Sequence, residues 1–340
     1  MLKIDPQYVR ALQAAASKEE LQVFLQNAIE LEHATIPPYL TAMYSLRPGA
    51  NEEISSLIRS VVIEEMLHMT ISANILIATG GSPRINDPRF VPTYPGPLPM
   101  GIGGDLVVPI QAFSKELVKN VFMEIEEPEN PVPVSHGLLM TPEYVTIGQF
   151  YQAIQDKIRE LGDGIFVVGP ERQMLTWFDP QELFPIVDVE SANRALELVV
   201  IEGEGTSSDP FESPGEPAHY YRFGEIYYGR KLIATPDGYS YAGEPIAFDE
   251  EGVFPMIDNP QESDYAPGSQ VALLSEIFTA GYSNLLNALH QTFNGAPERI
   301  DTAIGLMYQL RLQAQKLMST PVEPGSERTA GPVYRYVPAT

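Results

Sequence analysis

The sequence contains no cysteine, and this absence excludes several kinds of site. Without a thiolate there can be no disulfide, no iron–sulfur cluster and no cysteine-ligated zinc centre. Basic residues are also scarce, because 21 lysines and arginines stand against 45 aspartates and glutamates, for a formal net charge of −24. A surface with this charge repels phosphate backbones, so we expect no nucleic-acid partner.

Long apolar runs are missing as well. No stretch of about eighteen uninterrupted apolar residues occurs, so we expect no membrane-spanning segment and no membrane partner. The opening residues, MLKIDPQYVR, do not follow the basic-then-apolar order of a signal peptide, and we therefore expect a cytoplasmic protein. The apolar content of 44% and the charged content of 19% are typical of a globular chain with a sizeable core.

The sequence does contain a series of helical patterns. Two long patterns, at about residues 18–46 and 52–79, are joined by a short connection that predicts antiparallel packing. Pro37 and Pro38 should kink the first helix, because proline removes a backbone donor and clashes with the preceding turn. Further helical patterns cover about 111–124, 146–161, 189–203, 213–229, 269–292 and 297–318. The segment KLIATPDGYSYAGEPIAF alternates around a PDG turn and predicts a small β-hairpin.

Histidine is rare, with only five in the chain. Three of them close a Glu-x-x-His pattern, namely Glu30–His33, Glu65–His68 and Glu216–His219. Residues three apart on a helix share a face, so such a pair can hold one ion from one side. A single pattern of this kind is more often a solvated surface pair than a metal site. The apolar face of each helix therefore decides which pairs point into the core.

The two long helices each place one acidic position in their apolar row. On the second helix, Glu65 and His68 both lie in this row and should point at the core. On the first helix the apolar row continues through Glu32, whereas Glu30 and His33 lie on another row. Glu32 is therefore the expected inward carboxylate. The proline kink leaves Glu30 and His33 open as the alternative.

The two later bundle helices supply the remaining candidates. Glu202 lies in the inward row near the end of the third helix, with Glu204 as a nearby alternative. In the fourth pattern, Ser213 is expected to cap a helix that carries Glu216 and His219 on one face. A competing role for Glu216 is that of an acid stabilising the first turn of that helix.

The inward set comprises four carboxylates and two imidazoles: Glu32, Glu65, His68, Glu202, Glu216 and His219. One Glu from each of two helices and a Glu-x-x-His from each of two others is how four-helix bundles hold two carboxylate-bridged metal ions. Two divalent cations would neutralise carboxylates that otherwise repel one another and take up protons. Oxygen-rich ligands with imidazole and without sulfur favour two iron ions, with manganese or zinc as alternatives.

Five strings carry a resemblance to a known family: LEHATIPPYLTAMYSL, EEMLHM, ATGGSP, IEGEGT and AHYYRFGEIYYGRKL. They resemble the ferritin-like domain of iminophenylpyruvate dimer synthases, enzymes of violacein-type and indolocarbazole pathways, over most of residues 18–320. The resemblance implies a mainly α fold, with a ferritin-like four-helix bundle in a single domain spanning residues 1–340. The bundle helices would be those at about 18–46, 52–79, 189–203 and 213–229, with a long insertion at 82–188 and additions at 230–340.

The expected function is that of a di-iron carboxylate oxidoreductase, which uses dioxygen on a small, amino-acid-derived or imine substrate. Because the synthases couple imines made by an amino-acid oxidase, the resemblance implies such an oxidase as a partner. Two alternatives are a metal-binding protein of ferroxidase type and a non-catalytic ferritin-like module. Arg222, one turn after His219, is a candidate partner for a ligand carboxylate or a substrate acid, with a surface salt bridge as the competing interpretation. A homo-oligomer stays open, and the loop at 82–110 is a candidate lid.

Overall fold

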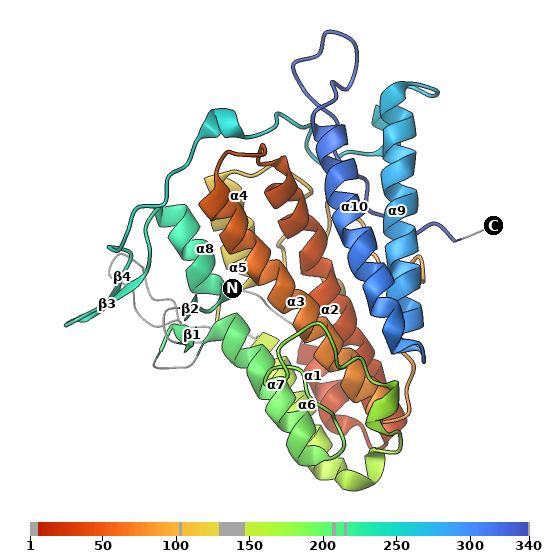
Figure 1. Cartoon of the computed structure of the whole chain (residues 1–340). Helices are drawn as coiled ribbons and strands as arrows, with labels where there is room; N and C mark the ends of the chain where they lie inside the picture. Colours follow the sequence, from red (N-terminus) through yellow and green to blue (C-terminus); the bar gives the residue numbers. More distant parts are fainter. Residues whose placement is uncertain (1–5, 102–103, 129–146, 206–208, 214–215, 339–340) are drawn as a thin grey trace.

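The computed structural model describes residues 6–101, 104–128, 147–205, 209–213 and 216–338. At its centre, two long helices pack antiparallel against each other, α2 (Lys18–Ser45) and α3 (Glu52–Ala78). On one side of this pair lie α6 (Ile147–Leu161), α7 (Val189–Glu204) and α8 (His219–Tyr228), and on the other lie α9 (Gln270–Phe293) and α10 (Ile300–Met318) (Figure 1). The mainly helical fold with additional C-terminal helices is confirmed.

Helix α2 continues through Pro37 and Pro38 without a break. Proline cannot donate a backbone hydrogen bond, so Pro38 leaves the carbonyl of Ala34 without its usual partner. The hydroxyl of Tyr94 donates to this carbonyl at 2.7 Å. Tyr94, from the segment that follows α3, therefore packs on α2 and replaces the hydrogen bond that the second proline removes.

Helix α3 is long and apolar enough to cross a membrane, but 83% of its most apolar window is buried inside the protein. It is thus placed as the core helix of the bundle. It ends at a glycine pair: the N–H of Gly81 donates to the carbonyl of Leu76, and Gly80 has a positive φ of 86°. This is the hydrogen bond and backbone conformation of a Schellman motif, in which glycine is favoured.

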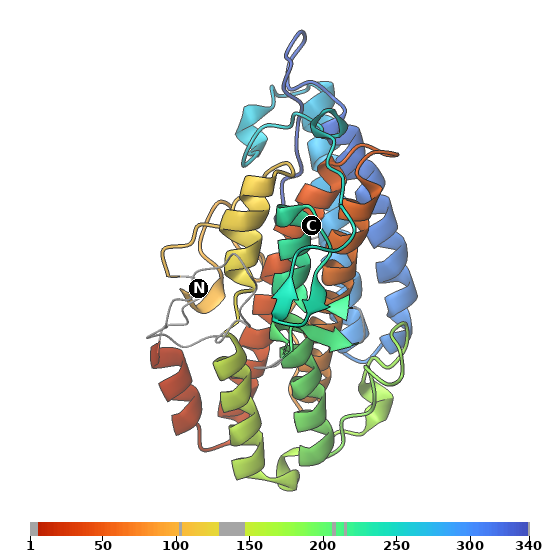
Figure 2. The ribbon, with the colours of Figure 1, turned by 90° about the vertical axis from the view of Figure 1, so that its left-hand side faces the viewer.

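The long insertion contains short helical segments before α6. Lys115–Leu117 (α4) and Met123–Ile125 (α5) flank a π-helical turn, Val118–Phe122, where the sequence predicts a helix over 111–124. Such turns are rare and are often found near functional sites. Figure 2 shows α6 and α7 side by side at one end of the bundle, with α8 and the α4–α5 segment nearer the other end.

The start of the fourth bundle helix differs from the expectation. The sequence pattern predicts a helix from about 213, but α8 begins at His219, after the N-cap residue Ala218. The preceding residues form two short antiparallel strands, β1 (Phe211–Ser213) and β2 (Glu216–Pro217). The carbonyl of Pro210 accepts from the N–H of Ala218, which fixes the chain in this turn.

The predicted hairpin is confirmed, with β3 (Ile233–Thr235) paired to β4 (Gly238–Ser240) around the PDG turn. An N-terminal helix, α1 (Pro6–Ala14), was not anticipated. Short 3₁₀ turns occupy Pro99–Gly101, Asp163–Ile165, Pro170–Arg172, Glu250–Gly252, Glu262–Asp264 and Pro297–Arg299. That the whole of 1–340 forms a single domain stays a prediction.

Candidate metal centre

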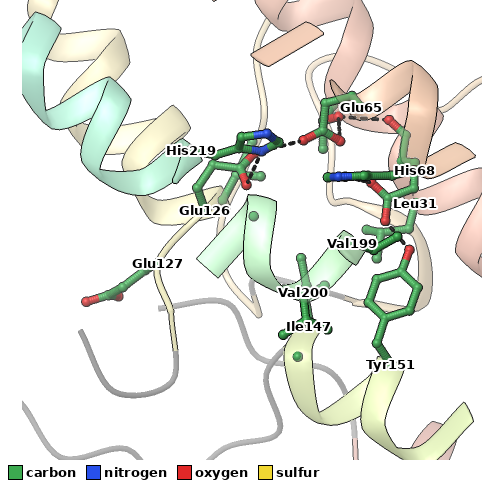
Figure 3. A pocket seen from close by; sticks show the side chains of 15 residues that line it. Leu31, Glu65, His68, Glu126, Glu127, Ile147, Tyr151, Val199, Val200 and His219 are labelled. Atoms are coloured by element: carbon green, nitrogen blue, oxygen red, sulfur yellow. Dashed lines mark hydrogen bonds and ion pairs between the residues drawn. The ribbon is translucent and has the colours of Figure 1, made fainter. Parts of the chain in front are cut away.

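Two groups of buried acidic and imidazole side chains meet inside the bundle. In each group, one potential ligand atom per residue lies within 4.8 Å of the others. The first group is Glu32, Glu65 and His68, and the second is Glu65, Glu126 and His219. Glu65 belongs to both, and Figure 3 shows it between the two imidazole rings.

The five side chains come from four elements that approach the same point. Glu32 is on α2, Glu65 and His68 are on α3, His219 is the first residue of α8, and Glu126 directly follows α5. Between 0% and 9% of each residue is exposed. Ionised groups so deeply buried are costly unless something pairs with them. These buried carboxylates therefore need positive charge beside them, from protons or from metal ions.

One ring nitrogen of each histidine faces the carboxylates. Nδ1 of His68 lies 3.7 Å from Oε2 of Glu32. Nδ1 of His219 lies 2.9 Å from Oε1 of Glu65 and 3.4 Å from Oε2 of Glu126. The His219 Nδ1 atom is buried and has no hydrogen bond of regular geometry within the described part of the chain. A buried nitrogen that faces two carboxylate oxygens in this way fits a metal ion between them.

The opposite nitrogen of each ring contacts a further carboxylate. Nε2 of His68 is 2.8 Å from Oε2 of Glu202, and Nε2 of His219 is 2.8 Å from Oε2 of Glu64. Metal-binding histidines usually donate their second N–H to a carboxylate or carbonyl, which fixes the tautomer and the orientation of the ring. Glu202 and Glu64 are placed to do this for the two imidazoles.

Hydroxyl groups hold the carboxylates of the two groups. Thr35 Oγ1 donates to Oε2 of Glu65 at 3.0 Å. The phenol of Tyr151 donates to Glu32, and the phenol of Tyr39 donates to Glu126. Each carboxylate is thus fixed by a neutral donor through one oxygen.

The close carboxylates shift one another's protonation. Burial, together with the charges of Glu126 and Glu32, raises the pKa of Glu65 to about 8. Burial opposes the charged form of His68, but its hydrogen bonds to Glu202 and Glu32 outweigh burial and raise its pKa to about 10. The pKa of His219 is raised in the same way, because contacts with Glu126, Glu64 and Glu65 outweigh burial. Without other cations, protons supply the positive charge of this centre.

A cavity of about 40 Å³ lies beside the two groups. Its other walls are largely aliphatic and include Leu31, Ile147 and Val199 (Figure 3). No described residue of the loop at 82–110 lines it, whereas Glu126 and Tyr151 from the rest of the insertion do. The described walls therefore come from the segments that flank residues 129–146 and from the bundle helices.

Of the six residues predicted as metal ligands, the structure brings Glu32, Glu65, His68 and His219 together, with Glu202 behind His68. Glu216 is not among them. It is exposed on β2, where it accepts a hydrogen bond from Ser213 Oγ at 2.8 Å. Residues with the Glu216–His219 spacing share a face only when both are on a helix, and Glu216 precedes the helix that begins at His219.

Glu126 takes the place expected for Glu216, and the sequence interpretation missed it. It lies just past the predicted end of the helical pattern at 111–124. A signal was nevertheless present: Val118, Phe122 and Glu126 follow one another in steps of four, and the first two are fully buried. An acid that continues an apolar row is the same signal that identifies Glu32 on α2.

Arg222 is engaged by protein carboxylates. Its Nη1 lies 2.7 Å from Oε1 of Glu64, its Nη2 lies 2.6 Å from Oε1 of Glu212, and its Nε donates to the carbonyl of Pro217 at 3.0 Å. The residue is buried. Of the three roles expected for Arg222, the structure supports the contact with a carboxylate near the centre, because the residue is buried and its guanidinium is occupied by Glu64 and Glu212.

The Glu30–His33 pair lies apart from the two groups. Glu30 accepts a hydrogen bond from Gln26, and His33 Nε2 lies 2.7 Å from the hydroxyl of Tyr282 on α9. Phe90 packs on the His33 ring, with 4.4 Å between ring centroids. Burial lowers the pKa of His33 to about 3. This histidine is a neutral core residue that joins α2 to α9.

We expect His33→Gln to make the protein less sensitive to acid. Because the unfolded chain binds a proton near pH 6.5 and the folded chain only near pH 3, the wild type loses stability as pH falls. Between pH 6.5 and 5 the loss due to this group is about 1.5 kcal/mol. Urea unfolding at both pH values should show a smaller loss for the variant by about this amount. An equal loss in both proteins would mean that His33 is protonated in the folded state.

Comparisons with a family model and with solved structures both find matches to this chain. The family described as ferritin-like matches residues 25–228, a range that contains both groups. A crystal structure of a ferritin-like protein from Caulobacter vibrioides superposes with a TM-score of 0.62 at 23% identity, covering 94% of this chain and 99% of that one. No curated protein matches the sequence. The narrower resemblance to iminophenylpyruvate dimer synthases stays a prediction.

Proposed function

This chain belongs to the ferritin-like family, and from that premise we propose that its two Glu/His groups bind a pair of divalent metal ions for oxidation chemistry with dioxygen. The observation that carries the proposal is the position of Glu65, which is shared by two groups, each completed by one imidazole and one further carboxylate. A carboxylate shared in this way can bridge two ions, with His68 on one and His219 on the other.

The charges and donor types of the site support two ions. Three carboxylates, Glu32, Glu65 and Glu126, face the two imidazoles, and Glu64 and Glu202 stand behind the rings. Two divalent ions bring four positive charges to this set of acids. Carboxylate and imidazole ligands without sulfur favour iron, with manganese or zinc as alternatives.

When bound, two ferrous ions would supply two electrons for reaction with dioxygen. The side chains of the two groups would hold the ions in position in a buried site. Glu202 accepts a hydrogen bond from Nε2–H of His68, and Glu64 accepts one from Nε2–H of His219. The Nδ1 lone pair of each ring then faces the centre. The adjoining cavity, of about 40 Å³, has largely aliphatic walls and room for only a few atoms, so it suits the apolar end of a small molecule rather than the whole of it.

We propose a small amino-acid-derived molecule or imine, supplied by an amino-acid oxidase, because of the resemblance to the dimer synthases. Arg222 is not proposed as the group that recognises a substrate acid, since Glu64 and Glu212 already occupy it.

The test is anaerobic titration of the metal-free protein with ferrous or manganous ion, followed by exposure of the ferrous protein to oxygen. We expect two ions per chain, magnetic coupling between them, and oxygen uptake that depends on the iron. Binding of one ion or none would reject the paired site. Two bound ions without oxygen uptake would reject the oxidoreductase and favour a metal-handling protein.

The Glu202→Gln variant tests the role of the carboxylates behind the rings. We expect affinity for one of the two ions to fall by about 10- to 100-fold, as is typical when the outer partner of a metal-bound histidine is changed. Isothermal titration with manganese measures this fall. Glu197→Gln, an exposed position on the same helix, is the matched control and should bind as the wild type does. Unchanged affinity for both ions in the Glu202 variant would mean that Glu202 does not contribute to metal binding.

A further inference from the structure

A second cavity, of about 50 Å³, lies on the far side of the central helix pair from the metal centre. It is lined by α2 and α3 on one side and by α9 and α10 on the other. Its lining is almost wholly aliphatic or thioether, for example Met66, Met69, Leu286 and Met307. The exceptions are His33 and two tyrosines, which contribute mainly their rings.

This cavity and the metal centre share the same two helices. Met66 and Met69 follow Glu65 and His68 directly in the chain, just as His33 follows Glu32. Neighbouring residues on a helix project about 100° apart. The α2–α3 pair therefore presents the candidate ligands on one face and the wall of this cavity on the next.

The size and polarity of the cavity decide what it can hold. An apolar cavity that binds benzene measures about 150 Å³, so 50 Å³ suits a molecule of only a few atoms. Water needs two to four polar partners. Nδ1 of His33 is buried without a hydrogen-bond partner among the described residues, whereas its Nε2 is taken by Tyr282. Because the rest of the lining is almost wholly aliphatic or thioether, a small apolar gas molecule fits this cavity.

We propose that this cavity is a binding site for dioxygen, which it stores beside the metal centre. The binding itself follows from the cavity, and its use by the metal centre rests on the proposed function. Dioxygen is apolar and diatomic, and it partitions from water into apolar spaces as xenon does. A site one helix layer from the candidate ligands would raise the local concentration of the oxidant.

The first test uses crystals pressurised with xenon, whose anomalous scattering marks small apolar sites. We expect one xenon peak among Met66, Met69 and Leu286, and its loss in Leu286→Phe, which fills the space. Leu274→Phe is the control, because Leu274 is half-buried on the same helix and does not line the cavity. Absence of xenon from the wild type, or ordered water in its place, would overturn the proposal.

The second test measures oxidation of the ferrous-loaded protein over a range of oxygen concentrations. We expect Leu286→Phe to lower the rate constant with oxygen several-fold while two ions per chain stay bound. Xenon binding with an unchanged rate would reject the link to the metal centre and retain the apolar site. If the wild type binds no metal, the proposed function fails and the xenon result still stands on its own.

Discussion

Replacing Glu65 by glutamine is expected to abolish tight binding of both metal ions. Glu65 is the residue that the two candidate groups share, so its loss removes one ligand from each. The fall in affinity should exceed the roughly 10- to 100-fold that is typical of an outer partner, because Glu65 would contact the ions directly. Metal content after loading and gel filtration, measured by mass spectrometry, gives the result.

Loss of metal in this variant should not reflect unfolding. Burial and the charges of Glu126 and Glu32 raise the pKa of Glu65 to about 8, so at neutral pH the metal-free protein holds this side chain largely protonated, and a neutral amide of the same shape resembles it. We therefore expect Glu65→Gln to melt at or above the temperature of the metal-free wild type. Thermal unfolding followed by circular dichroism checks this.

Three further substitutions make the result specific. Glu32 and Glu126 each belong to one group, so Glu32→Gln and Glu126→Gln should each lose one ion and retain the other. Glu216→Gln should retain both ions, because Glu216 is exposed on β2. If the Glu65 variant still binds one ion tightly, Glu65 is not shared. If the Glu216 variant loses metal, the exposed position of its side chain is wrong.

The sequence predicts the central helix pair closely because its signals are local. Helical spacing of apolar residues gives α2 and α3 to within about a residue of their observed ends, and the glycine pair after Ala78 marks where α3 ends. The same spacing places Glu32, Glu65 and His68 in the apolar row. Because a helix repeats regularly, the face of a side chain follows from its position in the chain.

The sequence fails where position depends on contacts between distant segments. Glu216 and His219 have a helical spacing, but the pairing of β1 with β2 keeps Glu216 outside α8. The Glu-x-x-His pattern does not predict this pairing. Glu126 follows a π-helical turn, whose wider winding departs from the regular period. Its approach to His219 depends on how the insertion folds back against α8, which local periodicity does not describe.

Glu64, which contacts the side of the His219 ring that faces away from the centre, is another residue whose position depends on a distant segment. On α3 it borders the apolar row, and spacing alone gives it no partner. The structure places it between His219 and Arg222, which lie more than 150 residues later in the chain. Burial raises its pKa, but these two partners outweigh burial and bring the pKa of Glu64 to about 2. The charge of Glu64 is thus fixed by α8, and with it the orientation of the His219 ring.

Arg222→Met is expected to destabilise the protein by about 3–5 kcal/mol, the usual effect of removing one partner from a buried ion pair. The change leaves Glu64 and Glu212 without their cation, and Oε2 of Glu212 already lacks a hydrogen-bond partner within the described residues. Burial and the charge of Glu64 raise the pKa of Glu212 to about 8 even in the presence of Arg222. The charged form of Glu212 is therefore unfavourable at this site, and Arg222 is the residue that partly offsets this. In thermal unfolding of the metal-free protein, the midpoint should fall by roughly 4–7 °C, given the entropy of unfolding of a chain of 340 residues.

A rescue experiment separates this charge effect from lost packing. Adding Glu212→Gln to the Arg222→Met variant removes a buried carboxyl that has lost its cationic partner, so a large part of the lost stability should return. Arg311→Met, which changes an exposed arginine on α10, is the matched control and should shift stability by no more than about 0.5 kcal/mol. If the double variant is no more stable than Arg222→Met, the arginine acts through its packing, and the carboxylates beside the metal centre do not depend on its charge.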